Sequence, residues 1–348
     1  MNITYKSQKL DQSIRATALK KTWLLEFMKR NLFWGWHNLM SATYVHAIIA
    51  ELLSLKIRKF GKGLITKEYQ GVISENSILI QAGAFCPDLP YLDEAISGKI
   101  PYLDIDEQKR WGDLMHYVNT GKLILFAVEF LKEKKNKKEA IEFNRCFQWF
   151  LGFVSHMIVD AVIHPIVEGI VGPYLSNEVE HRKCEMVQDV WLNMEVYDED
   201  IPQLDVISVT KYLKAPEIIE FWESLLTKCY NFYYVDEKPK FQEWIEDYQQ
   251  KLKIASGVTS SFGSYHGLTY PTFDEAKTKK EFLENLRTPS GKEMNFKEIV
   301  YNHMIPTVIE FWEVIIDGIE GKTDKYRNIF DFDMDSGKYI RTGNFVAW

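Results

Sequence analysis

Residues 148–167 read QWFLGFVSHMIVDAVIHPIV and combine an apolar composition with His156, Asp160 and His164 at intervals of four residues. Four residues advance an α-helix by about 400° and about 6 Å, so the three polar groups fall on one stripe of a predicted helix. Burying a carboxylate and two imidazoles without partners costs several kcal/mol, and a bound cation would satisfy all three. A lone histidine on an apolar face is usually a satisfied core residue, but three polar groups in register favour a metal site.

The composition predicts a folded globular protein with a substantial core. The chain has 348 residues, of which 46% are hydrophobic and 14% aromatic, so long disordered regions are not expected. Its formal net charge of −7 argues against binding nucleic acid through a broad basic surface. Bound metal ions would nevertheless supply local positive charge that this count omits.

The cysteines and the N-terminal region indicate a cytoplasmic protein. The four cysteines stand far apart without a C-x-x-C pair and are expected to be reduced core residues: Cys86, Cys146, Cys184 and Cys229. The first residues lack an apolar signal region and a small-residue cleavage site, so we expect secretion only if residues 1–35 are processed. No uninterrupted apolar run reaches the roughly 18 residues of a membrane span.

Apolar residues spaced by three and four predict an all-α architecture with a single multi-helix domain. The expected helices cover residues 41–58 (with Ser41 as N-cap), 107–133, 139–163, 177–195, 215–233, 238–254, 273–286 and 295–319. Pro165 is expected to end or kink the helix near His164, and residues 81–106 are expected to be loop-like. The end of the chain, FDFDMDSGKYIRTGNFVAW, is expected to form a small hairpin or a packed tail.

The expected helices and the charge distribution divide the chain into three predicted segments. Residues 1–35 form a basic, helical N-terminal extension, residues 36–325 form the all-α metal-binding domain, and residues 326–348 form a C-terminal tail packed on that domain. The extension is interpreted as a solvated helix, with a membrane-surface helix as the alternative.

The remaining candidate ligands stand in four further segments. His46 lies on the first predicted helix, Asp88 in GAFCPDLPY and His116 in GDLMHYVNTGK. His181 and Glu185 are four residues apart, so on a helix they can coordinate one ion from adjacent turns. Nitrogen and carboxylate ligands without thiolates suit Zn²⁺ or a similar divalent metal, and their number implies more than one ion. Three of the eight histidines lie in segments that offer neither a nearby carboxylate nor a helical face, and they are expected to be structural: His37, His266 and His303.

In this order the motifs resemble the zinc-dependent phospholipase C family, whose fold is shared with the single-strand-specific zinc nucleases. The shared marks are a histidine on an N-terminal helix, a Pro-Asp loop, a further histidine, a His-x-x-x-Asp helix with another histidine, and a His-x-x-x-Glu helix. They cover roughly residues 36–195 of this chain.

The resemblance implies two to three zinc ions and the hydrolysis of a phosphodiester. It implies one ion held by Asp88, His116, His156 and Asp160, a second held by His164, His181 and Glu185, and a third held by His46 with Asp160 as a bridge. Asp88 is also implied as a general base towards water. The expected substrate is a phospholipid or another small phosphodiester; nucleic acid is less favoured, and peripheral membrane contact is compatible with the aromatic content.

Three departures from the family pattern bear on these expectations. Secreted members complete the third site with an N-terminal tryptophan, whereas Trp36 is internal unless 35 residues are removed. The interval from Asp160 to His164 is shorter than in the secreted lipases, which predicts a tilted second site. Leu89 stands where some members have an aromatic residue that packs on the lipid head group.

Other metal-binding signatures fit the sequence less well. Glu178-x-x-His181 fits half of a di-iron signature but has no second copy, and no adjacent His-Asp pair supports a histidine-aspartate phosphohydrolase. DFDMDSG at 331–337 fails as a calcium loop because its glycine falls at position seven and Thr342 replaces the glutamate. Two alternative functions remain open. One is a zinc hydrolase of the nuclease or nucleotidase type, and the other is a non-catalytic binding protein in which metal ions only hold the helices together.

Overall fold

The computed structural model describes residues 43–95, 109–199, 209–236, 238–256 and 270–348. Contacts divide the chain into two compact units, Met1–Asn38 and Leu39–Trp348, and every described residue belongs to the second. The prediction of an N-terminal helical extension therefore lies outside the described residues, as do Ser41, His37 and His266.

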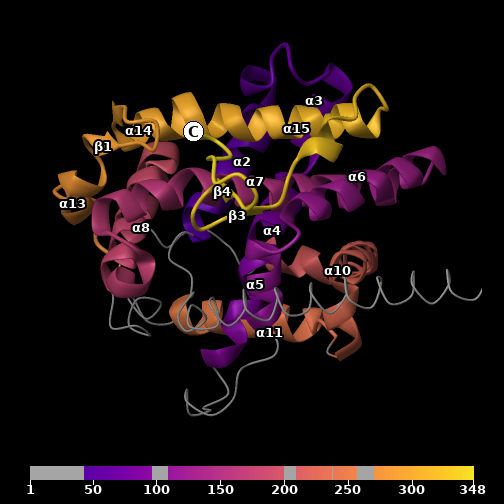
Figure 1. The fold of residues 1–348 in the computed structure, drawn as a ribbon, viewed down its shortest axis with the longest axis horizontal. Coiled ribbons are helices and arrows are strands. Elements are labelled where there is room, and N and C mark those ends of the chain that lie inside the picture. The colour runs from indigo at the N-terminus through magenta and orange to yellow at the C-terminus, as the bar shows by residue number, and fades with distance from the viewer. Residues whose placement is uncertain (1–42, 96–108, 200–208, 237, 257–269) are drawn as a thin grey trace, which may run out of the picture. The chain divides into compact units, whose positions relative to one another are not determined.

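The described part of the chain is almost entirely helical, which confirms the all-α prediction (Figure 1). Its longer helices are α2 (Thr43–Phe60), α3 (Lys67–Glu75), α4 (Ser77–Phe85), α5 (Lys109–Tyr117), α6 (Thr120–Asn136), α7 (Ala140–Val171), α8 (Tyr174–Tyr197), α10 (Pro216–Asp236), α11 (Phe241–Ser256) and α15 (Ile305–Ile319). Short turns of helix are η1 (Cys86–Ala95), η2 (Lys211–Lys214), α13 (Phe273–Ala276), η3 (Lys280–Phe282), α14 (Phe296–Ile299), η4 (Val300–Met304) and η5 (Lys325–Asn328).

Two small antiparallel hairpins complete the described structure. Leu286–Arg287 (β1) pairs with Glu293–Met294 (β2), and Phe332–Asp333 (β3) pairs with Lys338–Tyr339 (β4). The second is the hairpin predicted for the end of the chain. The first was not predicted, and the helix expected over residues 273–286 is reduced to the short turns α13 and η3 before it.

The helix α7 is the centre of the fold, because α4, α6, α8 and α15 all pack against it. Its middle turns are buried on every side, including Phe147, Trp149 and Phe153. By length and composition, α7 and the helical segment Phe296–Ile319 are apolar enough to cross a membrane. In α7, 89% of that apolar window is buried inside the protein, as expected of a core helix, compared with 50% in the second segment.

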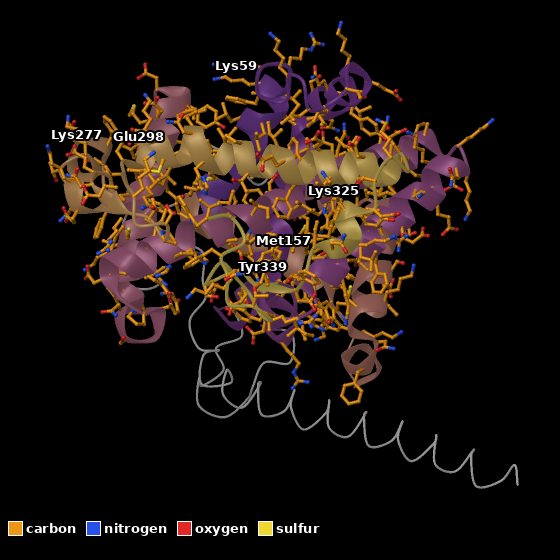
Figure 2. All side chains as sticks on the ribbon, turned by 45° about the horizontal axis from the view of Figure 1, so that its top comes forward. Lys59, Met157, Lys277, Glu298, Lys325 and Tyr339 are labelled. Atoms are coloured by element: carbon orange, nitrogen blue, oxygen red, sulfur yellow. The ribbon has the colours of Figure 1, made fainter. Side chains whose placement is uncertain are left out.

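Figure 2 shows how the side chains follow this arrangement. Met157, on α7, lies within the layers of helices and is fully buried, whereas Lys59 and Lys277 extend from the edge of the molecule. The four cysteines are buried and free, as predicted from their spacing.

Glycines allow α4 and α7 to cross at very short distance. A Cβ atom on Gly83 would lie 1.8 Å from the Trp149 carbonyl oxygen, and one on Gly152 would lie 1.8 Å from the Ile80 carbonyl oxygen. Only glycine permits this backbone approach, which places the end of α4 beside His156.

Three expectations about helix boundaries were wrong. Pro165 does not end its helix, since α7 continues to Val171. Residues 81–85 belong to α4 rather than to a loop, and the helix predicted over 107–133 is two helices separated by Asn119, whose φ is 56°. A left-handed residue of this kind breaks the α-helical hydrogen-bond pattern, and asparagine tolerates it better than most residues do.

The C-terminal hairpin packs on the turn of α7 that Pro165 leaves without a hydrogen bond. A proline removes the hydrogen bond to the carbonyl four residues earlier, here that of Ala161. Gly337, with a φ of 62°, packs directly on this carbonyl, and a Cβ atom there would lie 2.3 Å from the oxygen. The hairpin therefore occupies the helix surface next to His164.

Candidate metal centre

His156, Asp160 and His164 lie on one face of α7 at successive turns, and Asp160 stands between the two histidines. The distance from His156 Nε2 to Asp160 Oδ2 is 3.0 Å, and the distance from His164 Nε2 to Asp160 Oδ1 is 3.6 Å. The Asp160 side chain is only 3% exposed. The stripe predicted from the four-residue intervals is therefore a buried row of potential ligands.

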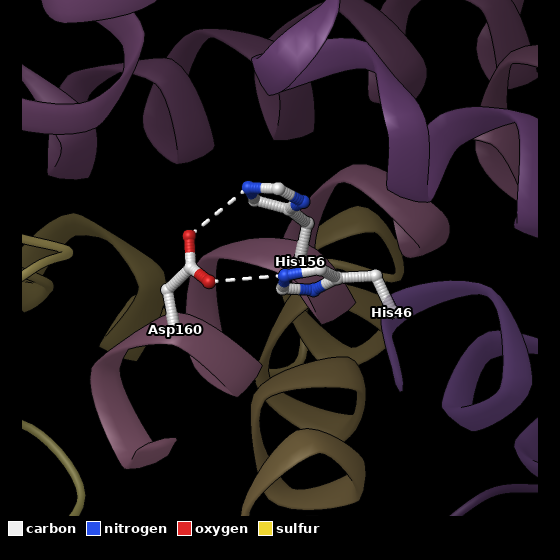
Figure 3. A group of neighbouring side chains, drawn as sticks. All are labelled: His46, His156 and Asp160. Atoms are coloured by element: carbon white, nitrogen blue, oxygen red, sulfur yellow. Dashed lines mark ion pairs between the residues drawn. The ribbon is translucent and has the colours of Figure 1, made fainter. Parts of the chain in front are cut away.

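The helix α2 adds His46 to this row, as Figure 3 shows. The Nε2 atom of His46 lies 3.0 Å from Asp160 Oδ1, and its ring stacks on that of His156 with centroids 4.0 Å apart. The neighbouring Val45 N–H donates to Asp189 Oδ1 on α8 at 2.8 Å, which fixes the start of α2 against α8. The two oxygens of Asp160 thus face two different imidazoles.

Asp88 on η1 and His116 on α5 approach His156 from other elements of the fold. Asp88 Oδ1 lies 3.2 Å from His116 Nε2 and 3.6 Å from His156 Nε2. His116 Nε2 lies 3.9 Å from Asp160 Oδ2. Four side chains from three elements therefore direct nitrogen and oxygen atoms towards one small volume.

Backbone carbonyls fix the orientation of both imidazoles. His156 Nδ1 lies 2.8 Å from the Ala84 carbonyl oxygen, and His116 Nδ1 lies 2.9 Å from the Gly112 carbonyl oxygen. A carbonyl only accepts, so each Nδ1 carries the hydrogen, and in the neutral ring Nε2 has a free lone pair. These Nε2 atoms face each other at 3.4 Å, beside the two carboxylates. Such a convergence of lone pairs suits a cation.

A second group of ligands forms where α7 meets α8. Glu185 Oε1 lies 3.2 Å from His181 Nε2 and 3.3 Å from His164 Nε2. His181 and Glu185 are one turn apart on α8, as their spacing predicts, and both are buried. The Nδ1 atoms of His46 and His181 are buried and form no hydrogen bond with any described residue, and the buried Nδ1 of His164 has only the Asp335 carboxylate beside it, at 3.4 Å.

The electrostatics follow from burial and from the close opposite charges. Burial alone would lower the pKa of His116, but the hydrogen bond and charge of Asp88, with Asp160 and Asp335, raise it to about 9. Burial would raise the pKa of Asp160, but the charges of His156, His164 and His46 hold it well below its usual range. Burial and the charge of His156 lower the pKa of His46. The carboxylates of the cluster therefore favour positive charge on the imidazole of His116.

The structure brings together all eight side chains singled out in the sequence. Their ligand atoms form three groups, each with all atoms within 4.8 Å of one another: His46, His156 and Asp160; Asp88, His116 and His156; His164, His181 and Glu185. In this grouping His156 belongs to two of the three groups. In the expected arrangement the residue common to the first and third sites was Asp160 instead. His303 lies apart, stacked on Trp348.

Sequence reasoning missed one carboxylate at the edge of this cluster. Asp335, in the β3–β4 hairpin, has its Oδ1 atom 3.4 Å from His164 Nδ1. Its surrounding motif DFDMDSG fails as a calcium loop, and nothing in its spacing relates it to α7, the helix that carries His164. Only the folded chain brings the two residues together.

The chain was compared with curated proteins, with solved structures and with models of protein families. Searches of curated proteins and of solved structures found no match to this chain. Residues 45–233, more than half of the chain, match the family described as Zinc dependent phospholipase C, and this segment includes all eight candidate ligands. The protein therefore belongs to the zinc-dependent phospholipase C family.

Proposed function

We propose that the protein is a zinc-dependent phosphodiester hydrolase of the phospholipase C type. The observation that carries this proposal is the pair of Nε2 atoms of His116 and His156, oriented by backbone carbonyls and directed at each other beside Asp88 and Asp160. Nitrogen and carboxylate ligands without a thiolate are the donors that zinc uses in hydrolytic sites.

In this proposal the cluster holds two to three zinc ions. The first would be held by Asp88, His116, His156 and Asp160, and the second by His164, His181 and Glu185. The third would use His46 together with Asp160, whose two oxygens already face different imidazoles. Zinc in such a site lowers the pKa of water to near neutrality and polarises phosphoryl oxygens.

Asp88 is the residue we propose as general base. Its side chain is 26% exposed, whereas that of Asp160 is 3% exposed, so Asp88 is the more accessible to water. Burial would raise the pKa of Asp88, but the charges and hydrogen bond of His156 and His116 lower it. The carboxylate is therefore ionised at neutral pH, as a general base must be, and its low pKa makes it a weak base that would depend on zinc to acidify the water.

For the substrate we propose a phospholipid or another small phosphodiester. Family membership supports a phospholipid-type substrate. The net charge of −7 disfavours a polyanion that would need many basic contacts. Leu89 in place of an aromatic residue leaves the head group undefined, so the substrate panel must include several head groups.

The test measures zinc and turnover in the same preparation. Native mass spectrometry and elemental analysis should find two to three zinc ions per chain. The protein should hydrolyse bis-p-nitrophenyl phosphate, lose this activity with a chelator and regain it with zinc. Phospholipid vesicles of several head groups and single-stranded DNA then separate the lipase type from the nuclease type. Bound zinc without turnover of any phosphoester would show that the metal only staples the helices.

A further inference from the structure

The C-terminal hairpin reaches the metal centre through Asp335, which lies outside the family match. Asp335 Oδ1 is 3.4 Å from His164 Nδ1. The opposite nitrogen of the same ring, Nε2, lies 3.3 Å from Glu185 Oε1 and 3.6 Å from Asp160 Oδ1. The imidazole of His164 is therefore placed between the cluster on one side and the hairpin carboxylate on the other.

Asp335 is held in this position by the helix that carries His116. The Tyr117 hydroxyl donates to Asp335 Oδ2 at 2.6 Å, and the Met334 N–H donates to the His116 carbonyl oxygen at 3.1 Å. The Asp335 side chain is 21% exposed. One carboxylate oxygen is thus occupied by Tyr117, and the other faces His164.

The rest of the hairpin is anchored to α6 and α7. The Thr120 hydroxyl donates to the Phe332 carbonyl oxygen at 2.8 Å and accepts from the Phe332 N–H at 2.7 Å. The Gly121 N–H donates to Asp331 Oδ1 at 3.0 Å. At the far end, the Trp348 indole donates to the Val162 carbonyl oxygen at 3.1 Å, one half-turn before His164. These contacts fix the distance between Asp335 and the imidazole.

The chemistry of a histidine ligand explains what this carboxylate does. A neutral histidine that gives its Nε2 lone pair to a metal carries a hydrogen on Nδ1, and this N–H needs an acceptor. The Nδ1 atom of His164 is buried, and the Asp335 carboxylate is the oxygen group that faces it. His116 and His156 use backbone carbonyls for the same purpose.

We propose that Asp335 is the positioning residue of the second metal site, holding His164 with Nε2 directed at His181 and Glu185. The inference rests on the zinc centre proposed above. Because both oxygens of Asp335 have partners, its role is to orient the imidazole rather than to bind the ion.

The test is a zinc titration of the full-length apo-protein against a competing chromogenic chelator, with Co²⁺ spectra as a second readout. Asp335→Ala should weaken one zinc ion by about 10–100-fold and leave the others at wild-type affinity. His164→Ala should weaken the same ion further. Asp335→Asn, which keeps an acceptor oxygen, and Tyr117→Phe should give intermediate losses, and in Asp335→Ala the Co²⁺ spectrum of the weakened site should change.

Asp331→Asn is the matched control, because it removes a charge from the hairpin, keeps an acceptor oxygen for the Gly121 N–H and does not face His164. It should bind zinc as the wild type does. If Asp335→Ala binds every ion with wild-type affinity, or weakens all ions equally, the inference is overturned while the proposed hydrolase function stands. If the wild type binds no zinc, both fail. Should Asp335→Ala not fold, Tyr117→Phe and Asp335→Asn decide the question in the same assay.

Discussion

The Nε2 atoms of His116 and His156 lie 3.4 Å apart although neither needs the other as a hydrogen-bond partner. Each ring already uses its Nδ1 hydrogen on a backbone carbonyl, at Gly112 and Ala84. Two neutral imidazoles in this arrangement direct lone pairs at each other, which is unfavourable unless a proton or a metal ion lies between them and the carboxylates. The two backbone carbonyls therefore orient both rings so that their Nε2 atoms can bind a cation.

His156→Ala should remove this preorganised site. We expect the variant to lose at least one tightly bound zinc ion and more than about 100-fold of the phosphodiesterase activity, because His156 belongs to two of the three ligand groups. Elemental analysis and hydrolysis of bis-p-nitrophenyl phosphate measure both quantities.

His303→Ala is the histidine control for that experiment. His303 is stacked on Trp348 and does not face the cluster, so the variant should keep its zinc and most of its activity. Full zinc content and full turnover in His156→Ala would remove the central claim.

Asp160→Asn and His46→Ala should differ in the number of ions that they lose. The two oxygens of Asp160 lie 3.0 Å from His46 Nε2 and from His156 Nε2, so this carboxylate faces two of the proposed ions. An amide has only one acceptor oxygen and no charge. Asp160→Asn should therefore lower the zinc content by more than one ion, whereas His46→Ala should cost at most one. Native mass spectrometry counts the ions, and equal losses in the two variants would argue against a bridging carboxylate.

The raised pKa of His116 gives the apo-protein a pH-dependent stability. Burial opposes protonation, but Asp88, Asp160 and Asp335 raise this pKa to about 9, above the value near 6.5 in the unfolded chain. A raised pKa stabilises the folded state fully below pH 6.5, and this contribution disappears as the pH rises towards 9. The melting temperature of chelator-treated protein should fall over this interval.

Zinc-loaded protein provides the comparison, because the proposed zinc would take the place of the proton between the same groups. Its melting temperature should change much less between pH 6.5 and 9, and zinc binding at pH 7 should release protons into the buffer. Isothermal titration in buffers of different ionisation enthalpy measures that release. A chelator-treated protein as stable at pH 9 as at pH 6.5 would contradict the prediction.

The sequence predicted those site residues that are spaced four apart on a single helix. His156, Asp160 and His164 lie at successive turns of one helix, as do His181 and Glu185, and both patterns are visible in the sequence because an α-helix has a fixed period. The positions of His46, Asp88 and His116 depend on tertiary packing, and the resemblance to a family rather than their spacing assigned them.

Elements that depend on tertiary contacts could not be predicted in the same way. Pro165 has a strong local tendency to end a helix, but Gly337 and the C-terminal tail pack around this turn and the helix continues. Asp335 lies next to His164 because the hairpin is anchored at Thr120 and Gly121 and because Tyr117 holds the carboxylate itself. In both cases a segment from the end of the chain packs at the position in question, and the local sequence gives no sign of it.

The crossing of α4 and α7 should be the most sensitive point of the fold outside the ligands. A Cβ atom on Gly152 would lie 1.8 Å from the Ile80 carbonyl oxygen, and backbone on both sides of the contact leaves nothing flexible to move. Gly152→Ala should therefore lower the free energy of unfolding by about 3 kcal/mol or more. It should also weaken zinc binding, because separating the helices moves the Ala84 carbonyl away from His156 Nδ1.

Gly71→Ala is the matched control for this crossing. Gly71 lies on α3, and a Cβ atom added there would have no neighbour within 4 Å, so alanine should leave stability unchanged or raise it by up to about 1 kcal/mol. Chemical denaturation of both variants, with and without a chelator, separates the loss of packing from the loss of metal. If Gly152→Ala were as stable as Gly71→Ala and kept its zinc, the two helices would not be in backbone contact, and the orientation of His156 would need another cause.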